Sequence, residues 1–216
     1  MQMKTLAASA LIAVMIVGCG TSAKEEAPAP KEAKADTPPK LMMGASAAML
    51  ASTCEGCHGD KGVSNGPATP SIAGMSVDYF TEAMHEFAEG DTVTTIMTRI
   101  AKGYNEAEIQ AMAKYFAKQK PASAKQETQT SLAMRGANIH EEYCSECHKN
   151  GGKDVSEDAG LLAGQWMPYL RNTITDYRNG DRLGGKKMVK KLNEMVDAHG
   201  EKGIEALVNY YGGQRL

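Results

Sequence analysis

The pentapeptide Cys-Glu-Gly-Cys-His at residues 54–58 recurs as Cys-Ser-Glu-Cys-His at residues 144–148, an offset of 90. Other matches at this offset are Ala73-Gly74 with Ala163-Gly164, Tyr79 with Tyr169, Phe87 with Tyr177, and Gly90-Asp91 with Gly180-Asp181. Self-similarity at a fixed spacing is the signature of a repeated structural unit. The chain is therefore predicted to contain two copies of one unit.

The closing segment of each copy has apolar residues at i, i+3, i+4 and i+7, the spacing of a buried helix face. These residues are Ile109, Met112, Ala113 and Phe116 in the first copy and Ile204, Leu207, Val208 and Tyr211 in the second. The two sets lie 95 residues apart, so the second copy holds a five-residue insertion upstream of this segment. Asn105 followed by Glu108 predicts a capping box at the start of the first closing helix.

Each copy is predicted to consist of a short helix that ends at the cysteines, a Gly-rich loop, a middle helix and a closing helix. No segment shows convincing period-2 alternation, so the predicted fold class is all-α. We place the two domains at residues 41–120 and 131–216. A polar linker that begins with Pro121 is expected at residues 121–130.

The pattern C-x-x-C-H is the attachment signature of c-type haem, in which two thiols add to vinyl groups and the adjoining histidine lies under the iron. It predicts two covalently bound haem c groups, attached through Cys54, Cys57, Cys144 and Cys147, with His58 and His148 as proximal iron ligands. The apolar macrocycle would also fill the core of a domain of about 80 residues, in a chain that is only 6% aromatic. A thioredoxin-like dithiol would need a βαβ setting, and zinc would need a second cysteine pair within one copy.

The sixth iron ligand is expected later in each copy. The first copy has no histidine beyond residue 85, which favours methionine. Met97 lies 39 residues after His58, and Met188 lies 40 residues after His148. Because the two spacings match, we predict Met97 and Met188 as the axial ligands.

Ligation by histidine and methionine fills both axial positions of the iron and raises its reduction potential. We therefore expect an electron-transfer protein with no catalytic residues. His199 is the bis-histidine alternative in the second copy, and a haem peroxidase would need an open iron position. The 24 Lys and Arg against 26 Asp and Glu give a net charge of -2, which leaves no basic excess for binding nucleic acid.

The N-terminal segment has the features of an export signal. Lys4 precedes an apolar run at residues 6–17, which is too short to span a bilayer but suits a signal peptide, predicted at residues 1–18. The run ends in Ile-Val-Gly-Cys, which resembles the lipobox of bacterial lipoproteins and makes Cys19 the lipid-modified first residue. With a solvated tether at 19–40, we expect a periplasmic lipoprotein held at the membrane through Cys19. The alternative is an ordinary signal peptide cleaved near Ala23.

The sequence resembles the dihaem class I cytochromes c, and within them the cytochrome subunit of flavocytochrome c sulfide dehydrogenases, over nearly everything from residue 54 to the C-terminus. The segments that carry the resemblance are residues 66–68, 70–73, 95–97, 99–104, 162–166, 168–170 and 186–188. The resemblance implies two tandem class I cytochrome c domains, each wrapped around its haem. It also implies Met97 and Met188 as axial ligands.

In that family, the haem-bearing subunit pairs with an FAD-binding subunit that oxidises sulfide, and electrons pass from the flavin through the haems to a soluble c-type cytochrome. The resemblance implies these two partners for this chain as well. The predicted lipid anchor departs from the soluble complexes of the family. It makes a free-standing, membrane-tethered dihaem carrier that supplies a terminal oxidase or reaction centre the alternative.

Overall fold

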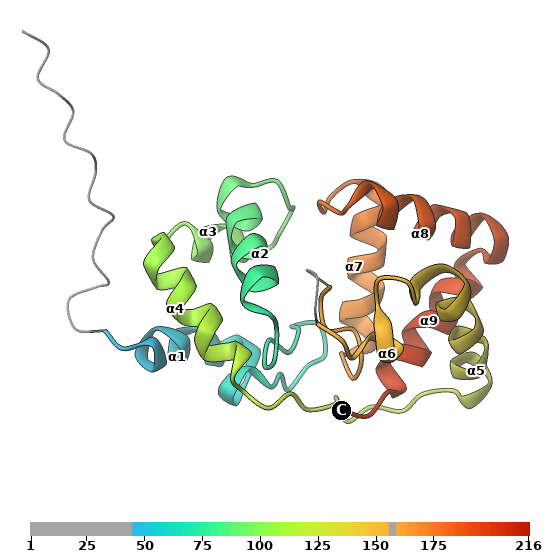
Figure 1. Cartoon of the computed structure of the whole chain (residues 1–216), viewed down its shortest axis with the longest axis horizontal. Helices are drawn as coiled ribbons and strands as arrows, with labels where there is room; N and C mark the ends of the chain where they lie inside the picture. Colours follow the sequence, from blue (N-terminus) through green and yellow to red (C-terminus); the bar gives the residue numbers. More distant parts are fainter. Residues whose placement is uncertain (1–44, 156–158) are drawn as a thin grey trace, which may run out of the picture. The chain divides into compact units, whose positions relative to one another are not determined.

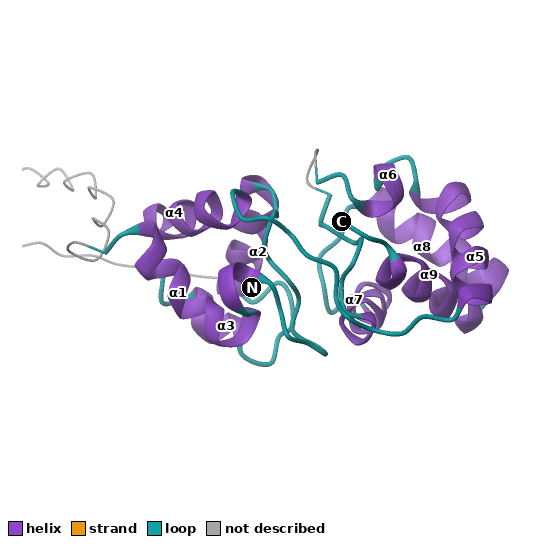
Figure 2. Cartoon of the chain, turned by 90° about the horizontal axis from the view of Figure 1, so that it is seen from below, coloured by secondary structure: helices purple, strands orange, loops and turns teal. Residues whose placement is uncertain are grey.

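The computed structural model describes residues 45–155 and 159–216, which form helices, short helical turns and loops. Figure 2 shows helices joined by loops, and no strand occurs among the described residues, so the predicted all-α class is confirmed. The expected signal peptide, Cys19, the tether and residues 41–44 of the first domain lie outside the described residues. Every helix in the described part is too short or too polar to cross a membrane.

The elements of the first copy lie in the blue-to-green part of Figure 1. They are α1 (Ala47–His58), the 3-10 turn η1 (Asp60–Gly62), α2 (Val77–Glu89), α3 (Met97–Ala101) and α4 (Glu106–Ala117). Serine hydroxyls cap two of these helices. Ser46 Oγ accepts the Met49 N–H, and Ser76 Oγ accepts the Tyr79 N–H, which satisfies backbone donors that a first turn leaves free.

The predicted capping box at the start of α4 is present. The Asn105 side chain accepts the Glu108 N–H at 3.1 Å, and the Glu108 carboxylate accepts the Asn105 N–H at 3.0 Å. The reciprocal pair satisfies two otherwise free backbone donors and fixes where α4 begins.

The second copy follows the same order with some longer elements. They are α5 (Thr130–Ile139), the π-helical turn η2 (His140–Cys144), α6 (Lys149–Gly152), α7 (Met167–Asn179), α8 (Lys186–His199) and α9 (Glu201–Gly213). Helix α5 continues through η2 to Cys144. The N–H groups of Cys147 and His148 then donate to the Cys144 carbonyl, so the second cysteine pair, like the first, lies at a helix end.

The prediction of three helices per copy is incomplete, because a further helix lies between the middle and closing helices. It is α3, with five residues, in the first copy and α8, with 14 residues, in the second. The predicted insertion falls here, since α8 has 14 residues where α3 has five, which more than offsets the shortening of the following connection from residues 102–105 to Gly200 alone. Helix α3 is too short to show an apolar period, but Met188, Leu192 and Met195 of α8 have helical spacing, so α8 was predictable from the sequence.

Each copy packs around its own apolar core. The predicted buried faces of the two closing helices are confirmed, because every one of their eight residues is at most 3% exposed. In the first copy, the Phe80 ring of α2 stacks on Phe116 of α4. In the second copy, Ile139 and Leu170 pack with the buried face of α9.

The segment that joins the copies is held against the second copy. The Ala124 N–H donates to the Gly164 carbonyl at 2.7 Å. The Gln126 side chain donates to the Gln165 carbonyl at 2.7 Å and accepts the Met167 N–H at 2.8 Å. These bonds satisfy backbone groups that a loop would otherwise leave to water.

Gly136 lies where α5 packs on α9, and a Cβ added there would stand 2.1 Å from the Ala206 carbonyl oxygen. Because that oxygen belongs to a packed helix backbone, Gly136→Ala has to push the two helices apart. We expect it to lower the free energy of unfolding of the holoprotein by about 1–3 kcal/mol. A guanidinium titration followed by circular dichroism measures this loss.

The matched control is Gly185→Ala. A Cβ at Gly185 meets nothing within 4 Å, and its φ of -55° suits alanine. A Gly136→Ala chain as stable as the Gly185→Ala chain would contradict the close crossing of α5 and α9.

Candidate haem sites

The first cysteine pair lies in the last turns of α1. Cys54 is half-buried against the first core, with its Sγ 3.9 Å from Met112 Sδ, whereas Cys57 is exposed. Gly59 then turns the chain with φ +79°, and a Cβ there would collide with backbone 1.9 Å away. The helix therefore ends at His58, the last residue of the motif.

The ring of His58 is held by a backbone carbonyl, with Nδ1 2.8 Å from the Pro70 oxygen. A carbonyl oxygen only accepts, so Nδ1 carries the hydrogen and Nε2 keeps its lone pair for a metal. Burial lowers the pKa of His58, which favours the neutral imidazole that binds metals. The ring thus has the tautomer and charge that a proximal haem ligand requires.

The second cysteine pair shows the same pattern of exposure, with Cys144 half-buried and Cys147 exposed. Burial, and then the nearby His140, lower the pKa of His148 and keep its ring neutral. Among the buried side-chain nitrogen and oxygen atoms of the described residues, only His148 Nδ1 lacks a hydrogen-bond partner. His148 Nδ1 therefore lacks the carbonyl partner that fixes the His58 ring in the first copy.

A cavity opens beside this second pair. It is lined by Cys144, Cys147, His148, Met188 and Met195 and by apolar or aromatic residues that include Leu161, Leu162, Leu170, Ile174, Leu192, Leu207 and Tyr211. Thiols, an imidazole and a thioether on apolar walls are the donor set and surroundings of a covalently attached haem. The residues present therefore fit that group.

Two methionines of the second copy reach this cavity. Met188, near the start of α8, is half-buried. Met195 is fully buried, and its Sδ lies 2.8 Å from where a Cβ on Gly203 would stand, so its sulfur packs on α9. His199 is the bis-histidine alternative. Its Nδ1 is 3.5 Å from Arg135 Nη2, and it is not among the residues that line the cavity.

In the first copy, Met97 begins α3 and packs, half-buried, against the same core as Cys54. The remaining methionines of this core are Met75, Met84 and Met112, each at most 6% exposed. The structure thus brings Met97 and the first cysteine pair to one cluster of side chains.

A polar cluster that the repeat does not predict lies beside the second cavity. Met75 and Tyr79 of the first copy also line that cavity. Arg182 of the second copy donates to the Tyr79 hydroxyl at 3.2 Å and to the Tyr177 hydroxyl at 3.1 Å. Arg182 stands where the first copy has Thr92, and because most positions at this offset differ, the repeat could not have identified Arg182.

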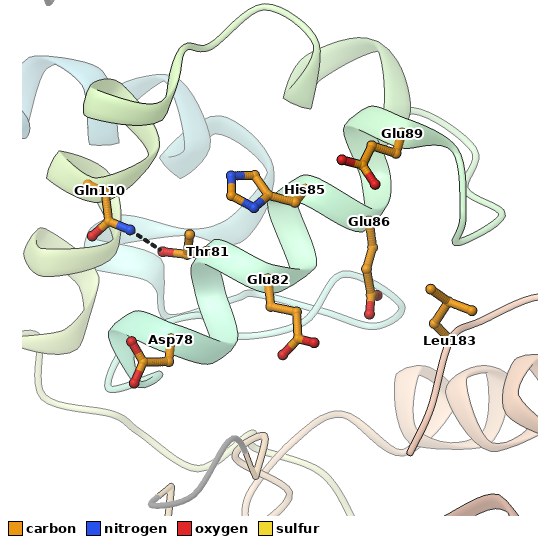
Figure 3. Close-up of a pocket in the computed structure, with 8 residues that line it drawn as sticks. All are labelled: Asp78, Thr81, Glu82, His85, Glu86, Glu89, Gln110 and Leu183. Atoms are coloured by element: carbon orange, nitrogen blue, oxygen red, sulfur yellow. Dashed lines mark hydrogen bonds between the residues drawn. The ribbon is translucent and has the colours of Figure 1, made fainter. Parts of the chain in front are cut away.

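A second hollow, over α2, has a different chemistry (Figure 3). Its lining comprises Asp78, Thr81, Glu82, His85, Glu86, Glu89, Gln110 and Leu183. These residues are mostly acidic or polar, and none is a cysteine or methionine. The hollow therefore lacks the thiols and apolar walls of a haem site.

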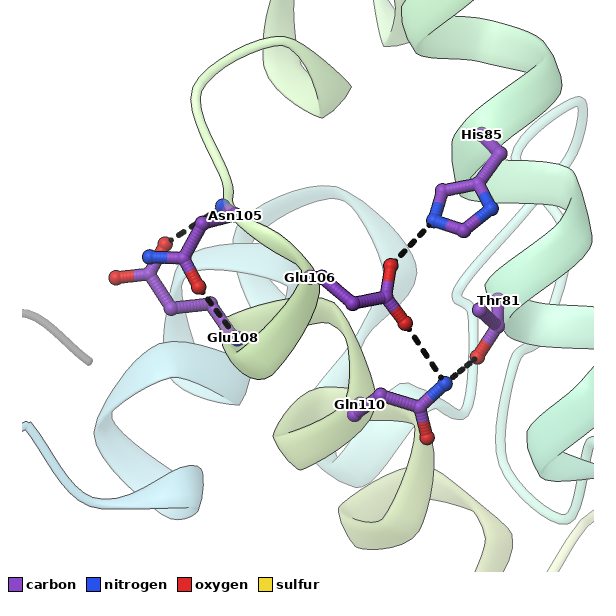
Figure 4. A network of polar contacts seen from close by, with 6 residues as sticks. All are labelled: Thr81, His85, Asn105, Glu106, Glu108 and Gln110. Carbon is purple, nitrogen blue, oxygen red and sulfur yellow. Dashed lines mark hydrogen bonds and ion pairs between the residues drawn. The ribbon is translucent and has the colours of Figure 1, made fainter. Parts of the chain in front are cut away.

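His85, the remaining histidine of the first copy, is paired at the edge of this hollow (Figure 4). Its Nε2 lies 2.6 Å from a Glu106 carboxylate oxygen, and Gln110 donates to the same carboxylate at 3.1 Å. Gln110 also donates to the Thr81 hydroxyl at 3.2 Å. The network ties α2 to α4 and engages His85 outside the first core.

Comparison with known proteins gives several relatives, although no model of a known protein family matches the chain. Cytochrome c4 of Pseudomonas aeruginosa is 29% identical over 173 residues, which cover 76% of this chain and 84% of the relative. The thiosulfate dehydrogenase electron acceptor of Thiomonas intermedia is 31% identical over 144 residues, 62% of this chain and 66% of the relative. The cytochrome subunit of sulfide dehydrogenase from Chlorobaculum tepidum is 43% identical over 68 residues, 32% of this chain and 61% of the relative.

The crystal structure of reduced cytochrome c4 from Pseudomonas stutzeri matches the fold with a TM-score of 0.67 at 24% identity, covering 79% of this chain and 100% of that chain. This fold and the two C-x-x-C-H strings define a dihaem class I c-type cytochrome, and the prediction of two covalently bound haem c groups is confirmed. Within this class, the chain is an electron carrier similar to cytochrome c4. The resemblance to the sulfide dehydrogenase subunit, expected over nearly everything from residue 54 to the C-terminus, covers 68 residues, or 32% of the full chain.

Proposed function

We propose that each copy binds a six-coordinate haem through the residues of its repeat. The attachment residues are Cys54 and Cys57 in the first domain and Cys144 and Cys147 in the second, with iron ligands His58 and Met97 in the first and His148 and Met188 in the second. The domains are residues 41–120 and 131–216, joined at 121–130. The bond from His58 Nδ1 to Pro70 supports this ligation, as does the presence of both His148 and Met188 in the lining of one cavity.

The ligation explains why the chain passes electrons. When bound, haem c supplies a one-electron couple. His58 with Met97, and His148 with Met188, would hold the two irons, which would leave no coordination site for a substrate. The two thiol-and-imidazole motifs at matched helix ends are the observation that carries this function.

For the electron donor, we propose a dehydrogenase that oxidises a reduced inorganic sulfur compound. The first candidate is the FAD-binding subunit of a sulfide dehydrogenase, supported by the 43% identity to the cytochrome subunit of such an enzyme. The second is a thiosulfate dehydrogenase, supported by the longer match to an electron acceptor of that enzyme. A soluble c-type cytochrome is the proposed acceptor, with a terminal oxidase or reaction centre as the alternative.

The proposed location is the periplasm, with the chain held at the membrane by a lipid on Cys19. The apolar run and the Ile-Val-Gly-Cys string support this location. Metabolic labelling with radioactive palmitate checks the anchor, because label that is absent from the purified chain would rule it out.

The donor is tested by purifying the complex gently from native membranes through a tag at the C-terminus of this chain. Sulfide and thiosulfate are then added anaerobically to separate samples. Haem reduction by sulfide, with a flavin signal at about one per two haems, identifies the sulfide dehydrogenase. Reduction by thiosulfate without flavin identifies the second candidate.

Ascorbate serves as the control, because it reduces a competent dihaem chain whatever the natural donor. Haems that ascorbate reduces but neither sulfur compound does would contradict a sulfur dehydrogenase as donor. The free-standing carrier would then be the remaining assignment.

A further inference from the structure

The side chain of Gln165, just before α7, crosses from the second copy to the first. It is 1% exposed. Its Oε1 accepts the Ser71 N–H at 3.0 Å, and its Nε2 donates to the Ser71 carbonyl at 2.8 Å. Because leaving a buried amide without hydrogen-bond partners is costly, this pair of bonds fixes the Ser71 backbone.

The peptide group that Gln165 binds, between Pro70 and Ser71, is also the one that accepts the hydrogen bond from His58. Pro70 precedes Ser71, and the Pro70 oxygen lies 2.8 Å from His58 Nδ1. The carbonyl of Pro70 and the N–H of Ser71 belong to one planar peptide group. By fixing that N–H, Gln165 also orients the carbonyl that accepts from His58.

A neighbouring contact steadies the same loop. Trp166 Nε1 donates to the Ser64 carbonyl at 3.1 Å, and the Ser64 N–H donates to Ser71 Oγ at 3.0 Å. Gly66 makes room for the indole, since a Cβ there would stand 2.4 Å from the ring. Two adjacent residues of the second copy therefore hold both ends of the loop that carries Pro70.

The first copy offers no reciprocal support. At the offset of the repeat, Gln165 corresponds to Met75, whose thioether has no N–H to donate. Within the described part of the chain, His148 Nδ1 has no hydrogen-bond partner. Thus a residue of the second copy supports the hydrogen bond of His58 in the first copy, whereas the described residues of the first copy provide no such bond to His148.

We propose that Gln165 is a positioning residue for the first haem iron, acting through the Pro70–Ser71 peptide on the His58 imidazole. The inference rests on the proposed role of His58 as proximal ligand. A hydrogen bond from Nδ1 to a fixed carbonyl raises the basicity of the imidazole, which stabilises ferric iron. Loss of the clamp therefore raises the reduction potential of the first haem and leaves that of the second unchanged.

The test is a redox titration of the full-length holoprotein with Gln165→Met, which installs the first-copy residue at this position. Paramagnetic NMR of the haem methyl groups assigns each one-electron wave to its domain. We expect the equilibrium constant for reducing the first haem to rise about fivefold, roughly 40 mV at 59 mV per tenfold change. The second wave should stay in place.

Asn209→Leu is the matched control, because Asn209 is a similarly buried amide whose partners, Gln129 and Glu205, lie outside the first copy. Trp166→Phe removes the bond to Ser64 but keeps a ring, so it should give a smaller shift in the same direction. It carries the test if Gln165→Met does not fold.

The role of Gln165 would be overturned if the potential of the first haem stayed unchanged in both variants. It would also be overturned if both potentials shifted together, as expected for a general loss of tertiary packing. A wild-type chain that lacks the spectrum of histidine–methionine ligation would overturn the proposed ligands instead. The two failures are therefore distinguishable.

Discussion

Alanine at both Cys144 and Cys147 is expected to leave a chain that carries one covalently bound haem instead of two. The walls of the second cavity, including Leu161 and Leu170, surround the space beside these thiols. Without an attached haem, these side chains lose the apolar group that completes the domain core. A domain of about 80 residues is marginally stable without such a group. The second domain should therefore become sensitive to protease while the first stays folded.

The haem-to-chain ratio from the pyridine haemochrome spectrum, combined with limited proteolysis, measures both effects. Ser145→Ala is the control, because Ser145 is a spacer within the motif and its hydroxyl donates only to the Glu141 carbonyl. This control should keep two haems and full protease resistance. Two covalent haems per chain in the double cysteine variant would refute attachment at this pair.

The features that the sequence predicts correctly are those set by residues close to one another in the chain. The capping box needs only Asn105 and Glu108, and the buried faces of α4 and α9 follow from a helical period. The cysteine motifs are equally local, since two thiols and an imidazole within one or two helical turns define the attachment chemistry. Each of these could be predicted without knowing how the two copies meet.

Besides the helices α3 and α8, the features missing from the prediction depend on contacts between the copies. The bonds of Gln165 to Ser71 and of Arg182 to Tyr79 join residues 94 and 103 positions apart. No period or motif encodes such pairs. Both Gln165 and Arg182 do stand where the repeat breaks, opposite Met75 and Thr92. Most positions at this offset differ between the copies, however, so such a mismatch does not by itself mark an intercopy contact.

Removing one of the two proposed methionine ligands is expected to lower the reduction potential of one haem only. Ligation by methionine together with histidine raises the potential of haem iron. In Met188→Ala the second iron would lose the proposed thioether ligand. We expect the second potential to fall by at least about 100 mV, within the roughly 0.8 V over which axial ligands set haem potentials. Met97→Ala should have the same effect on the first haem.

Substitutions of two further methionines serve as controls that distinguish loss of an iron ligand from loss of side-chain packing. Met195 lines the same cavity as Met188, but its sulfur packs on Gly203, so Met195→Leu should keep both potentials. Met134 is 68% exposed, and Met134→Ala should change neither potential nor spectrum. The long-wavelength band of methionine-ligated ferric haem should fall by about half in Met97→Ala or Met188→Ala. If Met195→Leu weakens the band instead, Met195 is the ligand of the second iron. Because Met195 has no methionine counterpart in the first copy, the spacing of the repeat would then not predict the ligand.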